Sequence, residues 1–150
     1  MTIRDLYNSM DYGTAPESAG DALAWLVDQG SRFGQFIDGS FTEPTDSFEA
    51  KNPANGNVLA TLSQATQQDV DTAVQAARKA QAKWAKNDHD RAKVLYAIAR
   101  LLQKHARLFA VLETLDNGKP ILESRDIDVP LAIRHFYYHA GMAQLMSDQM

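Results

Sequence analysis

Three short stretches of the sequence carry residue types that could do chemistry. The first, "ETLDNGKP" at residues 113–120, contains the Gly-Lys pair that is typical of phosphate-binding loops. Such a loop needs several glycines before the lysine, a serine or threonine after it, and a strand in front. Here a helical pattern precedes a single glycine. The stretch therefore predicts a helix that ends with Gly118 in the left-handed conformation and is stopped by Pro120. Asn117 and Lys119 are expected to face the last carbonyls of that helix.

His135 and His139 have the spacing with which one helix can present two imidazoles to a metal ion. A zinc site of that kind also needs a glutamate directly after the first histidine and a third ligand, and Phe136 occupies that place. We therefore expect these residues to form an aromatic face that packs against a neighbour, rather than a metal site. The members of that face would be Phe136, Tyr137, Tyr138 and His139.

Asp126 and Asp128 form the third stretch, on either side of one isoleucine. Paired carboxylates can act as acid and base, but only in a pocket that shifts their pKa values, and the sequence indicates no such pocket. A solvated loop or a helix cap before Pro130 is the expected role. The chain contains no cysteine, so it supplies no cysteine nucleophile, disulfide or cysteine zinc ligand.

Composition and charge narrow the function classes further. The chain has 150 residues, 45% of them hydrophobic, with a net charge of −4, as in an ordinary soluble globular protein. Between Thr72 and Arg107 the sequence has nine lysines and arginines but only two aspartates. This pattern predicts a solvated helical face rather than a nucleic-acid site. The start carries Asp5 and Asp11 and no signal-like apolar run, and no stretch approaches the roughly 20 apolar residues of a membrane span. We expect a cytoplasmic protein without nucleic-acid or membrane partners.

The elements that would position these residues are two hairpins followed by helices. A short helix is expected over residues 16–29, ended by a glycine. Residues 33–43 predict a hairpin around Asp38-Gly39, and residues 46–63 predict a second one around an Asn-Pro and Asn-Gly turn, together a small antiparallel sheet. A first long helix is then expected to begin at a Thr66–Asp69 capping box. A second helical stretch is expected from Asn87 or Asp88 to the end at Gly118, and a third from about 121 to 147 with a kink or restart at Pro130. Their expected apolar stripes are Val70, Ala73, Val74, Ala77, Ala80 and Trp84 in the first, and Val94, Leu95, Ile98, Leu101 and Leu102 in the second. The fold class is α+β: two β-hairpins followed by a helical bundle.

The order of these motifs resembles the front of the aldehyde dehydrogenase superfamily. The matching pieces are "FIDGSF", "NPANGNVLATLSQAT", "DVDTAVQAARKAQAKW", "DRAKVLYAIARLLQKH", "LETLDNGKP" and "FYYHAG", which span about residues 33–146. The leader before them is similar to that of a subfamily in which two aldehyde dehydrogenase units are fused in one polypeptide, some members of which resemble degenerate enzymes. The resemblance implies that residues 1–30 are a leader with a short helix. It also implies that residues 31–150 are an incomplete, N-terminal part of the α/β cofactor domain.

The family's reaction oxidises an aldehyde to a carboxylic acid through a cysteine nucleophile, with NAD or NADP as hydride acceptor. Those catalytic residues, and the glycine-rich turn that binds the dinucleotide, lie downstream of the matching segment. The resemblance therefore implies an N-terminal segment of an NAD(P)-dependent oxidoreductase that has no catalytic residue, binds no cofactor by itself and is inactive alone. Its partners would be the rest of that fold or further copies of itself. The alternative is a non-catalytic helical interaction module.

The resemblance also suggests roles for three residues. The helix that matches residues 131–147 lies near the family's substrate tunnel, which makes Tyr138 and Met142 candidates for lining it, with core packing as the alternative. Asp128 matches a position that is sometimes a ligand of a structural monovalent cation, with a helix cap as the alternative.

Overall fold

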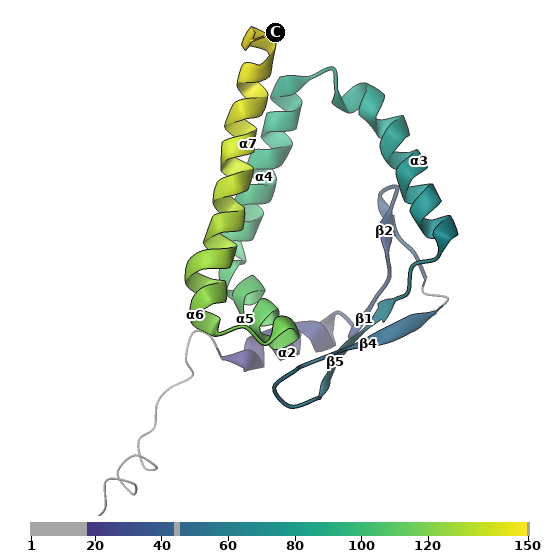
Figure 1. Ribbon diagram of the computed structural model, residues 1–150, viewed down its shortest axis with the longest axis vertical. Coiled ribbons are helices and arrows are strands. Elements are labelled where there is room, and N and C mark those ends of the chain that lie inside the picture. Colours follow the sequence, from purple (N-terminus) through teal and green to yellow (C-terminus); the bar gives the residue numbers. More distant parts are fainter. Residues whose placement is uncertain (1–17, 44–45, 150) are drawn as a thin grey trace, which may run out of the picture.

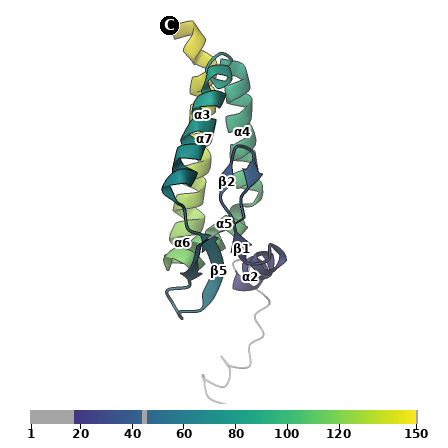
Figure 2. The same cartoon turned by 90° about the vertical axis from the view of Figure 1, so that its right-hand side faces the viewer.

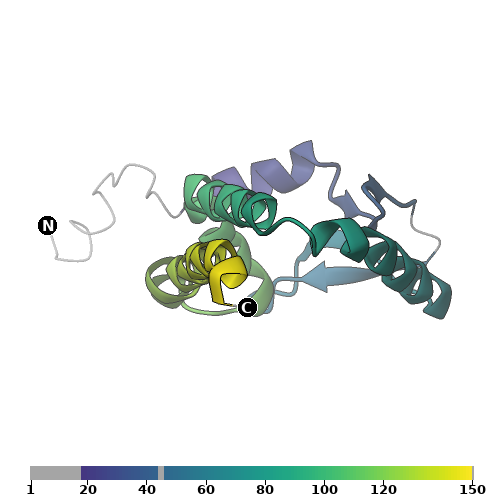
Figure 3. The same ribbon diagram turned by 90° about the horizontal axis from the view of Figure 1, so that it is seen from above.

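The computed structural model of this chain describes residues 18–43 and 46–149. Two long helices, α4 (Asp88–Lys104) and α7 (Val129–Gln149), lie side by side and antiparallel (Figure 1). Most of the strands and two shorter helices lie at one end of this pair, and α3 (Gln67–Trp84) stands apart from it with β2 (Phe36–Ile37) at its side (Figure 1). Seen from above, α3 extends away from the pair formed by α4 and α7 (Figure 3). None of the helices in the described ranges is long and apolar enough to cross a membrane.

Helix α2 (Ala19–Asp28) matches the expected short helix, although Pro16 lies outside the described residues. The Ser18 hydroxyl accepts a hydrogen bond from the Gly20 N–H at 3.3 Å, which caps the first turn. Gly30 follows the helix with a φ of +76°, as expected of a residue that stops it. Ala22 and Leu26 are buried where α2 packs against α5 (Ala106–Asn117).

Both expected hairpins are present. β2 (Phe36–Ile37) and β3 (Ser40–Phe41) are antiparallel around Asp38-Gly39, and both turn residues have positive φ, as a type I′ turn requires. β4 (Ser47–Lys51) pairs antiparallel with β5 (Val58–Ser63).

The expectation of one small antiparallel sheet is wrong. The larger sheet is mixed, with the order β1-β5-β4, and β1 (Arg32–Phe33) runs parallel to β5. Positive φ values at Gly30 and Ser31 bring the chain alongside β5, where the Thr61 N–H donates to the Ser31 carbonyl at 2.9 Å. The β2–β3 hairpin forms a sheet of its own.

The final helical region begins at Ile121, as expected, but its irregularity precedes Pro130. α6 (Ile121–Glu123) continues into a π-helical segment, η1 (Ser124–Asp128), and then into α7. The Val129 N–H bonds to the Ser124 carbonyl, five residues back. Pro130 has no N–H for the carbonyl four residues before it, so a wider turn accommodates the proline without breaking the helix.

Alanines line the contact between α4 and α7. Ala92 and Ala99 in α4 and Ala140 and Ala143 in α7 are buried. The predicted stripe of α4 is therefore wrong in part, since Val94 and Leu101 are exposed. Small side chains let two helices approach closely, and here two tyrosine–glutamine hydrogen bonds border the contact: Tyr96 to Gln144 at 3.5 Å and Tyr137 to Gln103 at 3.1 Å.

The core of the described chain is thin. Seven of its ten buried hydrophobic residues are alanine, whereas eighteen large hydrophobic side chains are exposed. A stable monomer rarely leaves so much apolar surface open. Within the described residues most large apolar side chains are therefore left uncovered.

Candidate docking surface

Helix α3 begins with the predicted capping box. The Asp69 carboxylate accepts from the Thr66 N–H at 2.8 Å and the Thr66 hydroxyl at 2.7 Å, while the Asp69 N–H donates to Thr66 Oγ1. Gln35 of the β2–β3 region donates to the same carboxylate at 3.4 Å. Hydrogen bonds from Thr66 lower the pKa of Asp69, and the Gln35 bond adds to that shift. The helix start is thus fixed and tied to the hairpin.

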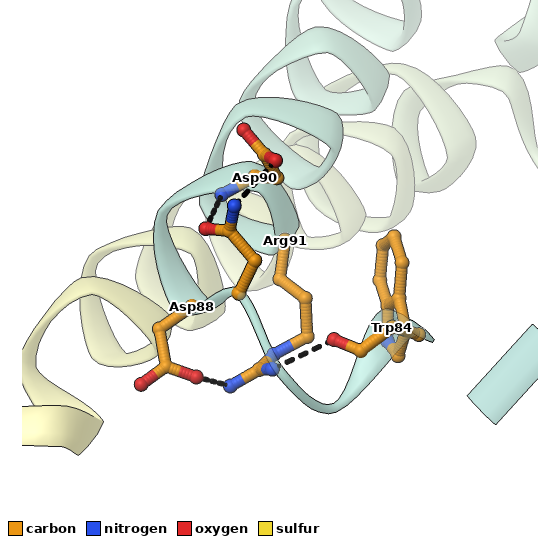
Figure 4. A network of polar contacts seen from close by, with 5 residues as sticks. Trp84, Asp88, Asp90 and Arg91 are labelled. Atoms are coloured by element: carbon orange, nitrogen blue, oxygen red, sulfur yellow. Dashed lines mark hydrogen bonds and ion pairs between the residues drawn. The ribbon is translucent and has the colours of Figure 1, made fainter. Parts of the chain in front are cut away.

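A polar clamp holds the corner between α3 and α4 (Figure 4). Arg91 Nη1 donates to the Trp84 carbonyl at 2.8 Å, and the other terminal nitrogen of Arg91 pairs with Asp88. The α4 cap, expected at Asn87 or Asp88, is Asn87, whose side chain accepts from the Asp90 N–H at 3.1 Å. Arg91 therefore joins the last residue of α3 to the first of α4.

A hollow of about 1170 Å³ lies along α3. Its lining comes from the second half of α3, the start of α4 and the tip of the β2–β3 hairpin, including Val74, Ala77, Trp84, Arg91 and Asp38. No residue of α3 is buried, and most of the exposed surface of the lining comes from apolar atoms, including the aliphatic stems of its charged side chains. The predicted apolar face of α3 therefore exists, but within the described chain only Ala73 of its residues is half-buried and the rest are exposed.

Basic side chains border this hollow. Arg78, Lys79, Lys83 and Lys86 belong to its lining, and none of them forms an ion pair within residues 18–43 and 46–149. Its acidic residues are Asp38 and Asp90, and Asp90 already contacts Lys93. The surface is an apolar floor with a surplus of positive charge around it.

The "ETLDNGKP" stretch is a helix end, as predicted, and not a phosphate loop. Gly118 follows α5 with a φ of +79° and donates its N–H to the Thr114 carbonyl at 3.0 Å. The expected contacts of its neighbours with the end carbonyls are wrong. Asn117 instead donates to the Glu113 carboxylate, and Lys119 reaches Asp128. A carboxylate is a stronger partner for an ammonium group than a carbonyl is.

Asp126 and Asp128 lie in η1, so the prediction of a loop or helix cap is wrong. The π-helical turn sends them to different partners. Asp126 pairs with Arg125 at 2.7 Å, a hydrogen bond that lowers the pKa of Asp126. Asp128 pairs with Lys119, and that hydrogen bond raises the pKa of Lys119. The two carboxylates do not form an acid–base pair. The monovalent-cation role of Asp128 stays a prediction.

The candidate residues of α7 lie on its open side. Tyr138 and Met142 are 62% and 38% exposed, one helical turn apart, so both are available to line a surface completed by other residues. Their tunnel role stays a prediction. The expected aromatic face is wrong in part: Tyr137 packs on Tyr96 with ring centroids 6.0 Å apart, whereas Tyr138 and His139 are exposed. Four consecutive residues cannot share one face of a helix.

His135 and His139 stack with ring centroids 6.4 Å apart. In the part of the chain that the structure describes, no group of three histidine, aspartate or glutamate side chains could hold a metal ion.

The described residues do not fit a dinucleotide. A cofactor pyrophosphate needs a glycine-rich turn from a strand into a helix N-terminus. The helix that follows β5 begins instead with "SQATQQD", residues 63–69, which contains no glycine, and Asp69 places a carboxylate at its first turn. That negative charge would repel a phosphate.

The mixed sheet, the helix pair and the uncovered apolar faces make the described chain a helix-rich α+β fragment. A model of the aldehyde dehydrogenase family matches residues 41–150. The Bacillus subtilis protein DhaS is 44% identical over 119 residues, and aldehyde dehydrogenase B of Escherichia coli is 40% identical over 114. An aldehyde dehydrogenase from Bacillus cereus, solved as an NAD⁺ complex, superposes with a TM-score of 0.70 at 37% identity over 73% of this chain and 23% of its own.

The chain therefore belongs to the aldehyde dehydrogenase family. It matches the N-terminal part of these proteins and spans about a quarter of their length, 24% of DhaS and 22% of aldehyde dehydrogenase B.

Sequence reasoning did not find the Arg91 clamp or the Lys119–Asp128 ion pair. The i,i+3 spacing of Asp88 and Arg91 could have indicated the first contact. No sequence pattern indicated the second, because it depends on the π-helical turn.

Proposed function

We propose that this chain is the N-terminal segment of an NAD(P)-dependent aldehyde dehydrogenase-like oxidoreductase that converts aldehydes to carboxylic acids. Its role is structural: residues 31–150 form an outer part of the cofactor domain, and the catalytic and dinucleotide-binding residues belong to the rest of the fold. The observation that carries the proposal is the family match over residues 41–150, in a chain that spans about a quarter of its relatives. The thin alanine core supports it.

A graft tests this proposal. The matching 114 residues of Escherichia coli aldehyde dehydrogenase B are replaced by those of this chain, and absorbance of the reduced nicotinamide is followed with several aldehydes. We expect the graft to oxidise aldehydes with NAD or NADP and this chain alone to give the buffer rate. Turnover by this chain alone, or a folded graft with no turnover, would contradict the proposal.

The graft also tests the proposed site residues. Tyr138 and Met142 are proposed to line the substrate tunnel, so Tyr138→Ala and Met142→Ala should change KM for long aldehydes more than for short ones. Asp128 is proposed as a ligand of a monovalent cation. The melting temperature of the graft should then differ between sodium, potassium and choline salts, and Asp128→Asn should abolish that difference.

Three further expectations stay proposals of the same kind. They are assembly into homo-oligomers, a cytoplasmic location, and membership of the subfamily with two fused units. The leader stretch that carries the last of these, residues 10–34, lies outside the described ranges at residues 10–17.

A further inference from the structure

The side of α7 that points away from α4 carries three side chains that can ligate a metal ion. His135, His139 and Met142 are spaced by four and three residues, which places them along one line of the helix. We call this line the outer face of α7. Ala140, which is buried, and Tyr137, whose ring contacts a tyrosine of α4, lie on the opposite side. The outer face is therefore separate from the contact between the two helices.

The two imidazoles of the outer face have no other polar role in the described chain. His135 and His139 are exposed, and neither forms a hydrogen bond or an ion pair within residues 18–43 and 46–149. Their rings lie 6.4 Å apart with planes inclined by 19°, and Tyr138 contacts one of them edge-on. A histidine pair four residues apart is the arrangement with which one helix offers two nitrogen ligands to the same ion.

Met142 adds a third ligand of a different kind. Its side chain is 38% exposed, and it follows His139 by three residues, so the thioether sulfur lies on the same line as the two rings. The search for clusters of histidine, aspartate and glutamate does not include this sulfur. The side chains beside the three on the outer face are Leu131 and Tyr138, which offer no carboxylate oxygen to a hard ion such as Mg²⁺ or Ca²⁺.

We propose that His135, His139 and Met142 bind one copper ion in its cuprous state, Cu⁺. Imidazole suits zinc, copper, iron and nickel alike, whereas a thioether is a soft ligand that selects Cu⁺ among them. Two imidazoles and one thioether therefore favour copper over the harder ions. All three ligands come from one helix of this chain. The proposal goes beyond the proposed function and does not rest on it, so an inactive graft would leave it standing.

A histidine comparison tests the site. The complete 150-residue chain is titrated without oxygen against a coloured Cu⁺ chelator, and the absorbance of the chelator complex is followed. We expect the chain to remove one copper ion from the chelator, and His135→Asn or His139→Asn to weaken binding about tenfold or more, because ligands held together act at a high effective concentration. His89→Asn is the matched control, since His89 is also exposed and lies on α4.

The control and the parent chain define the contrary results. His89→Asn should bind copper as the parent does. Equal weakening in His89→Asn and His135→Asn, or a parent chain that takes no copper from the chelator, would overturn the proposal. Because the substituted side chains are exposed, the melting temperatures of the metal-free variants should equal that of the parent, which shows that a lost site is not a lost fold.

A methionine comparison tests the choice of metal. Met142→Leu should weaken Cu⁺ binding about tenfold and leave the weaker binding of Zn²⁺ unchanged, because only the soft ion uses the thioether. Met10→Leu, outside the described residues, is the matched control and should change neither affinity. X-ray absorption of the copper-loaded chain should show a copper–sulfur contact that Met142→Leu removes. Equal Cu⁺ affinities in Met142→Leu and Met10→Leu would overturn the proposal.

Discussion

The ring of Pro53 lies against Gly118, so that a Cβ atom added to Gly118 would come within 2.8 Å of Pro53 Cγ. Pro53 belongs to the β4–β5 turn and Gly118 ends α5, so this contact joins the sheet to the helices. Both residues come from motifs that carry the family resemblance, "NPANG" and "DNGKP". The two motifs are therefore neighbours in space, and each restricts the other.

We predict that Gly118→Ala destabilises the chain for two reasons. The φ of +79° costs an L-residue about 1–2 kcal/mol, and the contact with Pro53 adds to it. Gly56→Ala is the control, because Gly56 has a φ of +74° and open space around it. Urea unfolding should show a larger loss of unfolding free energy for Gly118→Ala than for Gly56→Ala. Adding Pro53→Ala to the Gly118→Ala chain should recover part of that difference. Equal losses at the two glycines would show that the Pro53 contact carries no energy.

The helix ends and turns could be predicted because they depend on neighbours in sequence. Gly118, the Thr66–Asp69 capping box and the Asp38-Gly39 turn are all where their residue types indicate. Features that depend on residues far apart were missed. The parallel pairing of β1 with β5 also needs a positive φ at Ser31 that no pattern marks, and the Lys119–Asp128 pair needs a π-helical turn.

The candidate surface was predictable only in part, for the same reason. Apolar spacing showed that α3 has an apolar face, but spacing cannot tell whether that face is covered. The α4 stripe illustrates the limit: hydrophobicity favoured Val94 and Leu101, yet the helix contact uses Ala92 and Ala99, because close approach is decided by both partners.

The alanine contact between α4 and α7 gives a second prediction. Ala99 is completely buried, so Ala99→Leu forces the two helices apart and should cost about 1–3 kcal/mol of unfolding free energy. Ala97→Leu, at an exposed position of the same helix, should change it by less than about 0.5 kcal/mol. Thermal unfolding followed by circular dichroism measures both. An unfolding free energy that is unchanged in Ala99→Leu would mean that the two helices are not closely packed.

The α3 capping box predicts the effect of a threonine substitution. Thr66→Ala removes the acceptor for the Asp69 N–H and should cost about 1 kcal/mol. Thr72→Ala is the matched control, since Thr72 lies inside the same helix and bonds only to Gln68 of the preceding turn. Because alanine is the better helix former, Thr72→Ala should be neutral or slightly stabilising. The reverse order of the two variants would contradict a capping role.

The Lys119–Asp128 pair predicts a loss of stability in alkali. Its hydrogen bond raises the pKa of Lys119 above the ordinary 10.5, so the folded state holds this proton more tightly than the unfolded state. The contribution is therefore complete below about pH 10.5 and is lost as the pH rises through the folded-state pKa. Melting temperatures of the parent and Asp128→Asn should converge over that range. A constant difference between them would exclude the ion pair as its source.

The Arg91 clamp predicts that the direction of α3 can be changed without unfolding either helix. Arg91→Met removes the donor to the Trp84 carbonyl and the partner of Asp88, whereas Arg100→Met removes an exposed arginine of the same helix. The chain has no cysteine, so spin labels can be attached at cysteines introduced at Gln75 and Gln103 alone. The distance distribution between the labels should broaden in Arg91→Met and stay narrow in Arg100→Met, while helix content is unchanged. An unaltered distribution in Arg91→Met would mean that the backbone of the corner, rather than the arginine, sets the position of α3.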